Sequence, residues 1–254
     1  MEKSIEILRV LYETTSKHSN YQVLPEVLET IIKPGTLSVK SRFEKERLEY
    51  ISSKVNFINK KVLDIGGNTG YFSFELAKLK AAHIDYYEGN KTHAAFTEYA
   101  AELVNLSNKI TVHNSYFTFN NFLSRAYNVT LLLNVLHHIG DDYGDKELSV
   151  EHAKQMIVDH INYFADKTDI LILQLGFCWK GNRDMPLFKK GTKQEMIDYV
   201  KAGSKNFWVI QETAVPEIIN EKVIYKPVDK MNISRNDALG EYLNRPLFIL
   251  KSIK

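Results

Sequence analysis

The sequence has little of what marks secreted, membrane or metal-thiolate proteins. Its 254 residues include one cysteine, Cys178, which excludes an internal disulfide and a zinc–thiolate cluster and makes the cytoplasm the expected location. No apolar run approaches the roughly 18 residues of a membrane-spanning helix, so no integral membrane segment is expected. The acidic, amphipathic first residues do not resemble a signal peptide. A formal net charge of +2 argues against a general binder of polyanions.

The chain does have an ordinary globular composition, 44% hydrophobic and 25% charged. Seven segments are predicted as strands, at residues 61–65, 83–88, 109–113, 129–135, 169–175, 207–213 and 246–252. Helical patterns separate most of them, at residues 92–106, 147–164 and 193–202. We expect the last of these helices to begin with a capping box, formed by Thr192 and Glu195, and to be closed by Gly203.

This alternation of strands and helices predicts an α/β fold with a doubly wound, mostly parallel sheet. A long irregular stretch precedes the last predicted strand, which suits a final strand that runs in the reverse direction. Residues 1–58 are predicted to form an N-terminal helical lid that belongs to the same unit, and residues 59–254 to form the sheet domain.

A glycine turn follows the first predicted strand, and it is the most informative segment of the chain. The strand is the apolar run at 61–65, after which Gly66 and Gly70 let the backbone bend sharply and approach a ligand. Asn68 occupies the middle of the turn, where a left-handed conformation is tolerated by asparagine better than by most residues. Glu88 ends the second predicted strand, where a carboxylate can accept both hydroxyls of a ribose.

The pattern Asp64-x-Gly66-x-Asn68-x-Gly70 resembles the first motif of class I S-adenosylmethionine-dependent methyltransferases, for which D-x-G-x-G-x-G is the common form. The resemblance implies a Rossmann-like sheet of seven strands and S-adenosyl-L-methionine as the cofactor. It also places Asp64 near the methionine part of the cofactor and the turn beside its sulfur. The dinucleotide fingerprint would need glycines at 66, 68 and 71, where this chain has Asn68 and Tyr71.

Residues after the third and fourth predicted strands complete the expected cofactor site, because ligands of open α/β sheets bind outside the carboxyl ends of the strands. The resemblance implies that Asn114 or Ser115 holds the adenine amine while Tyr116 stacks on the ring. An ordinary polar strand end is the alternative. Asn134, which ends the fourth predicted strand, is also predicted to contact the cofactor.

His137 and His138 follow Asn134 in a segment that resembles the V-L-H-H of methyltransferases acting on small molecules and sugars. Transfer of a methyl group to a hydroxyl requires removal of the hydroxyl proton. The unperturbed pKa of histidine suits that task near neutral pH. A histidine pair in an arbitrary sequence is usually structural, but the position at a strand end favours catalysis by at least one of the two.

The same segment excludes two rival classes of methyltransferase. Enzymes that methylate amino groups of DNA bases carry two prolines here, whereas residues 134–137 contain none, so no DNA partner is expected. Catechol-type enzymes hold Mg²⁺ through carboxylates after strands four and five, but the fifth predicted strand ends in Gln174 without an acid. Asp141, Asp142 and Asp145 are interpreted as a solvated loop, and no metal is predicted.

Acceptor binding is predicted for the loop at 177–193, after the fifth strand. An aromatic side chain beside positive charges suits a sugar ring with a phosphate or carboxylate, although such a charge run is more often a solvated loop. In the N-terminal region, Arg42 is predicted to reach the cofactor carboxylate or the acceptor. The alternative is an ordinary surface turn. The predicted substrate-binding residues are Arg42, Trp179, Lys180, Arg183 and Arg245.

Residues 40–254 also resemble the methyltransferase part of enzymes that cap bacterial O-antigen polysaccharides, through the first motif, the His-His-Ile segment and the late Arg-Pro-Leu-Phe-Ile-Leu strand. The predicted acceptor is therefore a hydroxyl or phosphate of a glycan or of a glycosylated small molecule. Those enzymes carry a kinase, and no kinase motif is found here. The alternatives are a tRNA-modifying enzyme, against which the near-neutral charge stands, and a non-catalytic cofactor-binding partner. Oligomeric state is not readable from the sequence.

Overall fold

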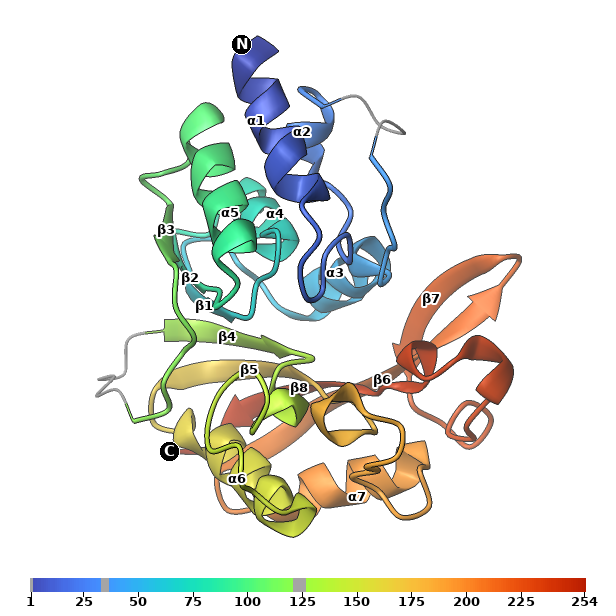
Figure 1. The fold of residues 1–254 in the computed structure, drawn as a ribbon. Helices are drawn as coiled ribbons and strands as arrows, with labels where there is room; N and C mark the ends of the chain where they lie inside the picture. Colours follow the sequence, from blue (N-terminus) through green and yellow to red (C-terminus); the bar gives the residue numbers. More distant parts are fainter. Residues whose placement is uncertain (1, 33–36, 121–126) are drawn as a thin grey trace. The chain divides into compact units, whose positions relative to one another are not determined.

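The computed structural model describes residues 2–32, 37–120 and 127–254, and the chain divides into two compact units, residues 1–117 and 118–254 (Figure 1). The first unit contains helices α1 (Glu2–Glu13), α2 (Glu26–Glu29), α3 (Glu44–Lys54), α4 (Tyr71–Lys78) and α5 (Lys91–Leu103). Its strands are β1 (Lys61–Ile65), β2 (His83–Tyr87) and β3 (Ile110–His113), which are parallel and ordered β3-β2-β1.

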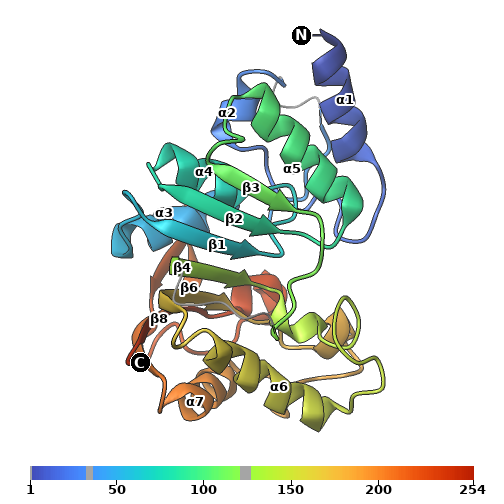
Figure 2. The same cartoon turned by 90° about the vertical axis from the view of Figure 1, so that its left-hand side faces the viewer.

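Burial explains why these segments of the first unit form strands and helices. In β1 every residue after Lys61 is buried, and in β2 the buried side chains alternate with half-buried ones. The Asn90 side chain begins α5 by accepting hydrogen bonds from the backbone N–H groups of Thr92 and His93. Figure 2 shows the three strands side by side with α5 along them and α1 beside α5. This packing brings the loops after β1 and β2 to one edge of the sheet.

The second unit contains β4 (Tyr127–Leu133), α6 (Val150–Tyr163), β5 (Thr168–Gln174), α7 (Lys193–Ser204), β6 (Trp208–Ile219), β7 (Lys222–Pro227) and β8 (Leu247–Ser252). Short 3-10 helices are η1 (Leu136–His138), η2 (Trp179–Gly181), η3 (Asp237–Leu239) and η4 (Tyr242–Asn244). The strands are ordered β4-β5-β8-β6-β7. β4 and β5 are parallel, whereas β8 is antiparallel to both β5 and β6.

The predicted α/β fold, its N-terminal helices and the reversed last strand are confirmed, but the prediction of seven strands was wrong. The described residues contain eight strands, because part of the stretch expected to be irregular forms β7. β6 and β7 make a hairpin whose turn is Asn220 and Glu221, both with positive φ, 48° and 63°. Two such residues match the twist of a two-residue hairpin turn. Asn220, a residue type that favours such turns, was the signal for this hairpin in the sequence.

The predicted α7 is confirmed, while the prediction of how it ends was wrong. Thr192 caps the helix by accepting from the backbone N–H of Glu195 at 3.2 Å, but the Glu195 carboxylate accepts from Lys190 N rather than from Thr192. Gly203 lies within the helix and does not close it. A Cβ there would stand 2.7 Å from a methyl of Val158 on α6, so the glycine permits close packing of the two helices.

Within the described ranges, no helix is long and apolar enough to cross a bilayer.

Candidate functional site

The glycine turn after β1 has the sharp bend that the sequence predicts. Gly66, Asn68 and Gly70 all adopt positive φ, 70°, 53° and 79°, so the expected left-handed conformation of Asn68 is confirmed. Position 67 has no room for a side chain, since a Cβ there would lie 2.3 Å from the ring of Tyr86. Two hydrogen bonds fix the backbone of Asn68: its N–H donates to the Glu88 carboxylate, and its carbonyl accepts from the Tyr86 hydroxyl.

Asp64 lies beneath this turn and is 3% exposed. Its Oδ2 accepts from the Ser73 hydroxyl on α4 at 2.7 Å. Burial raises the pKa of Asp64 to about 6; the Ser73 hydrogen bond opposes this rise, and the nearby Glu88 charge adds to it. In this position the carboxylate braces the strand end against the helix that follows it.

Replacement of Asp64 by Asn is expected to change how stability depends on pH. The folded-state pKa is raised from 3.8 to about 6, so the native state bears the cost of a buried charge above pH 6 and is relieved of it as the pH falls toward 3.8. The stability of Asp64→Asn relative to the unchanged protein should therefore be greater near pH 8 than near pH 4.5, by about 2 kcal/mol. Urea unfolding of both proteins at both pH values measures this, and an unchanged difference would show that the carboxyl does not titrate there.

Glu88, directly after β2, connects the two loops at the edge of the sheet. Its Oε2 accepts from Asn68 N at 2.8 Å, and its Oε1 accepts from Asn90 N at 2.7 Å. Each carboxylate oxygen can accept two hydrogen bonds, so these contacts do not exclude a diol ligand. The structure thus places the predicted ribose acceptor against the turn.

The residues after β3 lie at the same edge of the first unit. Asn114, Ser115 and Tyr116 are all exposed, Tyr116 by 48%. The Tyr116 ring packs over Gly89, where a Cβ would be 2.2 Å from it. An aromatic ring that lies against the loop after β2 is in a suitable place for the predicted stacking role, which stays a prediction.

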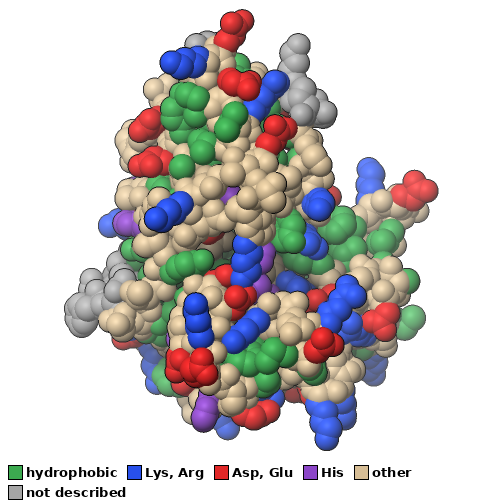
Figure 3. Space-filling model, in the orientation of Figure 1, with side chains coloured by type: hydrophobic (Ala, Val, Ile, Leu, Met, Phe, Trp, Pro, Cys, Tyr) green, Lys and Arg blue, Asp and Glu red, His purple; other side chains and the backbone are tan. Residues whose placement is uncertain are grey.

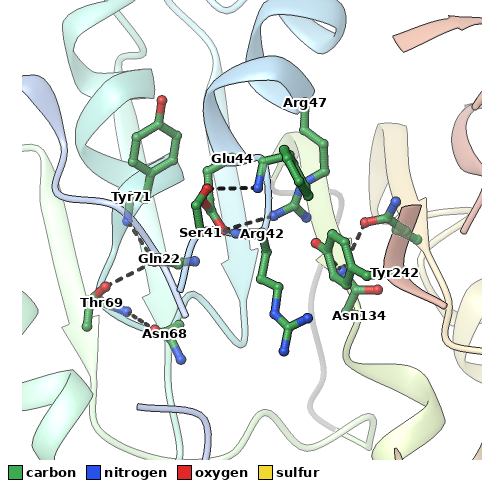
Figure 4. A network of polar contacts seen from close by, with 12 residues as sticks. Gln22, Ser41, Arg42, Glu44, Arg47, Asn68, Thr69, Tyr71, Asn134 and Tyr242 are labelled. Atoms are coloured by element: carbon green, nitrogen blue, oxygen red, sulfur yellow. Dashed lines mark hydrogen bonds and ion pairs between the residues drawn. The ribbon is translucent and has the colours of Figure 1, made fainter. Parts of the chain in front are cut away.

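Sequence reasoning missed a further element of this site, a strap formed by residues 16–22 between α1 and α2. The segment joins α1 to α2 (Figure 1), and it is hydrogen-bonded to the loops after both β1 and β2. Asn68 Nδ2 donates to the His18 carbonyl at 3.0 Å, and Asn90 Nδ2 donates to the Lys17 carbonyl at 3.2 Å. Gln22 Oε1 accepts from Tyr71 N at 3.1 Å (Figure 4). These partners are about fifty to seventy residues apart in the chain, which is why no local pattern signals them.

His93 on α5 completes the contact with the strap. Its ring is 2% exposed and lies between Asn68 Nδ2 and the Ser16 hydroxyl, at 3.3 Å from each. Burial lowers the pKa of His93 to about 4, and the neighbouring His18 adds to the effect. The ring is therefore neutral at pH 7, with Nδ1 accepting from Asn68 and Nε2 donating to Ser16.

Arg42 is half-buried just before α3, with its guanidinium carbon 4.5 Å from the centroid of the Tyr21 ring. Its backbone N–H donates to the Glu44 carboxylate at 2.8 Å, and the Ser41 hydroxyl donates to the same group (Figure 4). Arg47 and Glu44 form a buried ion pair in this helix, 3.6 Å apart. Arg42 thus adjoins the strap, through Tyr21, while its role toward a ligand stays a prediction.

In the second unit, Asn134 is the centre of a polar network after β4. It adopts positive φ, 65°, and its Nδ2 donates to Gln174 Oε1 at 2.9 Å and to the Tyr242 hydroxyl at 3.1 Å (Figure 4). Its Oδ1 accepts from Arg245 at 2.9 Å. Arg245 also forms an ion pair with Glu241 at 2.8 Å. The amide of Asn134 is thus fixed in orientation by three side chains.

The Arg245–Glu241 pair is expected to stabilise this network measurably. Burial alone would raise the pKa of Glu241, but the Arg245 charge and the N–H of Phe177 outweigh it, and the pKa is lowered. Because both side chains are partly buried, Arg245→Met should cost about 2 kcal/mol of unfolding free energy, between the values for surface and buried pairs. A double-mutant cycle with Glu241→Gln, followed by urea unfolding, measures the pairing; additive losses would show that the pair does not couple.

The two histidines after Asn134 differ in their environment. His137 is 1% exposed, and its Nδ1 accepts from Gly176 N at 3.1 Å, which puts the hydrogen of the neutral ring on Nε2. His138 is half-buried, with Nδ1 3.7 Å from Asp141 Oδ2 and 3.6 Å from Asp142 Oδ2. The Gly176 contact occupies Nδ1 of His137, whereas two carboxylates lie near Nδ1 of His138 at ion-pair distance. The catalytic role of either histidine stays a prediction.

The loop after β5 is built around Trp179 as a core residue. Trp179 is 2% exposed, its Nε1 donates to the Ile139 carbonyl at 2.6 Å, and Lys180 Nζ lies 4.2 Å from its ring centroid. The ring is thus unavailable as a stacking platform in this conformation. Arg183 is exposed. On the face drawn in Figure 3, basic and acidic side chains are interspersed, so this face has no continuous basic surface.

The fold described above recurs in solved structures. No family model and no curated protein matches the sequence. WbdD, described as a bifunctional kinase-methyltransferase, superposes with a TM-score of 0.58 at 16% identity, over 96% of this chain and 46% of WbdD. WbdD in complex with the kinase inhibitor LY294002 gives 0.60 at 17% identity, over 96% and 47%. This chain thus spans about half the length of WbdD.

A protein from Clostridium thermocellum proposed to be an rRNA methylase also superposes, with a TM-score of 0.51 at 12% identity, over 86% of this chain and 99% of that one. Matches at identities this low show a shared fold alone. The chain has the fold of these solved methyltransferase structures, which confirms the fold that the resemblance of the first motif predicts.

Proposed function

We propose that this chain is an S-adenosylmethionine-dependent methyltransferase that acts on a hydroxyl or phosphate of a glycan or of a glycosylated small molecule, in polysaccharide biosynthesis. The observation that supports it most is the glycine turn, with three left-handed residues and the Glu88 carboxylate bonded to its backbone. The cofactor would supply an electrophilic methyl group on a sulfonium. Its binding would involve Glu88, the turn from Asp64 to Gly70, the edge at Asn114, Ser115 and Tyr116, and Asn134.

The chain's own residues have distinct tasks in this proposal. Glu88 would accept from a ribose, and Gly66 and Gly70 would let the backbone approach the ligand. Asp64, being buried, braces the turn. The side-chain amide of Asn134 would contact the cofactor in one fixed orientation, because hydrogen bonds to Arg245 and Gln174 hold it in place.

His138 is assigned as the base for a hydroxyl acceptor. In this role Nε2 of His138 would take the proton of the acceptor hydroxyl, while the cofactor would supply the methyl group that the acceptor oxygen receives. Asp141 and Asp142 would stabilise the resulting imidazolium, because their carboxylates lie on the Nδ1 side. A phosphate acceptor is already ionised and would not need this base. Lys180, Arg183 and Arg245 remain the candidate cations for an anionic acceptor.

The test is turnover with labelled S-adenosylmethionine. Purified protein is incubated with a cell-envelope glycan extract and, separately, with bulk tRNA, and label is counted in each fraction. Label in the glycan fraction supports the proposal. Label only in RNA would assign the chain to RNA modification, and tight cofactor binding without any labelled acceptor would assign it a non-catalytic role. Calorimetric titration with the cofactor alone separates loss of binding from loss of transfer.

A further inference from the structure

The middle of the glycine turn carries an asparagine where the methyltransferase motif commonly has glycine, and the structure gives that side chain specific partners. Asn68 Nδ2 donates to the His18 carbonyl at 3.0 Å and lies 3.3 Å from Nδ1 of the neutral His93. Its Oδ1 accepts from Thr69 N at 2.9 Å. All the hydrogen-bonding groups of the amide are therefore used, two of them toward the strap and the helix that supports it.

A second asparagine repeats this arrangement at the next strand. Asn90 caps α5 with its Oδ1, while its Nδ2 donates to the Ser16 hydroxyl at 3.0 Å and to the Lys17 carbonyl at 3.2 Å. The loops after β1 and β2 carry the glycine turn and Glu88, which the proposed function assigns to the cofactor. A strap bonded to an asparagine on each loop therefore ties these two loops together within the first unit.

The strap is braced at both ends and bent in between. The Tyr12 hydroxyl on α1 donates to the Gln22 carbonyl at 2.5 Å, and Ser16 N donates to the Ser19 hydroxyl at 2.6 Å. His18 and Asn20 both have positive φ, 65° and 61°, a conformation that residues other than glycine rarely adopt. Non-glycine residues persist in such conformations where the surroundings impose them, which is common at ligand clamps. His18 is the residue whose carbonyl Asn68 binds.

We infer that Asn68 and Asn90 are positioning residues that latch the strap onto the two loops of the proposed donor site, so that release of the bound cofactor requires the latch to open. The inference rests on the proposed function for the identity of that ligand. It gives the departure from glycine at position 68 a purpose, because glycine would fit the same backbone conformation but could not hold the strap.

The test compares Asn68→Gly with a matched control, Asn105→Gly. Asn105 also has positive φ, 58°, lies in the same unit and is exposed. Asn90→Asp is the second test variant, since aspartate retains the helix cap but removes the Nδ2 donor. Amide hydrogen exchange of residues 14–22 is measured without cofactor, and dissociation of S-adenosylmethionine is measured by stopped flow. Loss of these hydrogen bonds should speed strap exchange about tenfold, with α4 unchanged, and should raise the dissociation rate by a similar factor.

Unchanged strap exchange in both Asn68→Gly and Asn90→Asp, or equal acceleration in Asn105→Gly, would overturn the latch. Faster exchange with an unchanged dissociation rate would overturn its control of cofactor release while leaving the proposed function intact. A wild-type protein that binds no S-adenosylmethionine would overturn the proposed function and, with it, the identity of the ligand under the strap. The exchange data would still decide whether the two asparagines hold the strap.

Discussion

Gly67→Ala should lower the affinity for S-adenosylmethionine about tenfold or more and should also reduce stability. The new Cβ would stand 2.3 Å from Cε2 of Tyr86, whose ring is fully buried. The ring cannot retreat freely, because its hydroxyl donates to the Asn68 carbonyl and accepts from Thr97 Oγ1 at 3.2 Å. Overpacking of this kind costs about 1–3 kcal/mol. The turn would move instead, and with it the Asn68 N–H that binds Glu88.

Calorimetric titration and thermal unfolding measure the two effects separately. Gly240→Ala is the control for loss of a glycine without a steric clash, since no heavy atom lies within 4 Å of its Cβ position, although Gly240, unlike Gly67, has positive φ, 72°. That variant should lose some stability and retain cofactor affinity. Gly67→Ala with full affinity would mean that the turn does not carry the donor site.

His138→Ala should reduce kcat about 10²–10⁴-fold on a hydroxyl acceptor while the cofactor dissociation constant stays unchanged. The range is that of a lost general base, and Nδ1 of His138 lies 3.6 Å and 3.7 Å from two carboxylates. His137→Ala should instead lower stability by about 1–3 kcal/mol, because the buried N–H of Gly176 would lose its acceptor.

Single-turnover rates and calorimetry separate these outcomes. His152→Ala, on the exposed face of α6, is the matched control and should change neither rate nor binding. An unchanged rate for His138→Ala would contradict the base assignment and would favour an acceptor that is already ionised, such as a phosphate.

The glycine turn of the candidate site could be predicted from the sequence because its determinants are local. The turn and Glu88 lie within one strand–helix–strand unit, and the left-handed geometry of Asn68 follows from its residue type. The strap was not readable, because the carbonyl that Asn68 binds is fifty residues earlier in the chain. Gln22 was missed for the same reason.

The acceptor half was less legible because residue type does not determine burial. Trp179 beside basic residues is typical of a sugar platform, yet its indole N–H donates to the Ile139 carbonyl and the ring is in the core. His137 and His138 are adjacent in sequence but differ in environment, since Gly176 packs against His137 while two carboxylates lie near His138. Such differences depend on tertiary packing, which the pattern of a single sequence does not contain.

The hairpin of β6 and β7 also has a consequence for association between molecules. β7 is the last strand in the order of the second unit and is paired with β6, and an open strand edge is a template for the strands of other chains. Here β7 carries Lys222 and Lys226 and ends at Pro227, which has no N–H to donate. Two lysines and a proline in six residues therefore protect this edge of the sheet from aggregation.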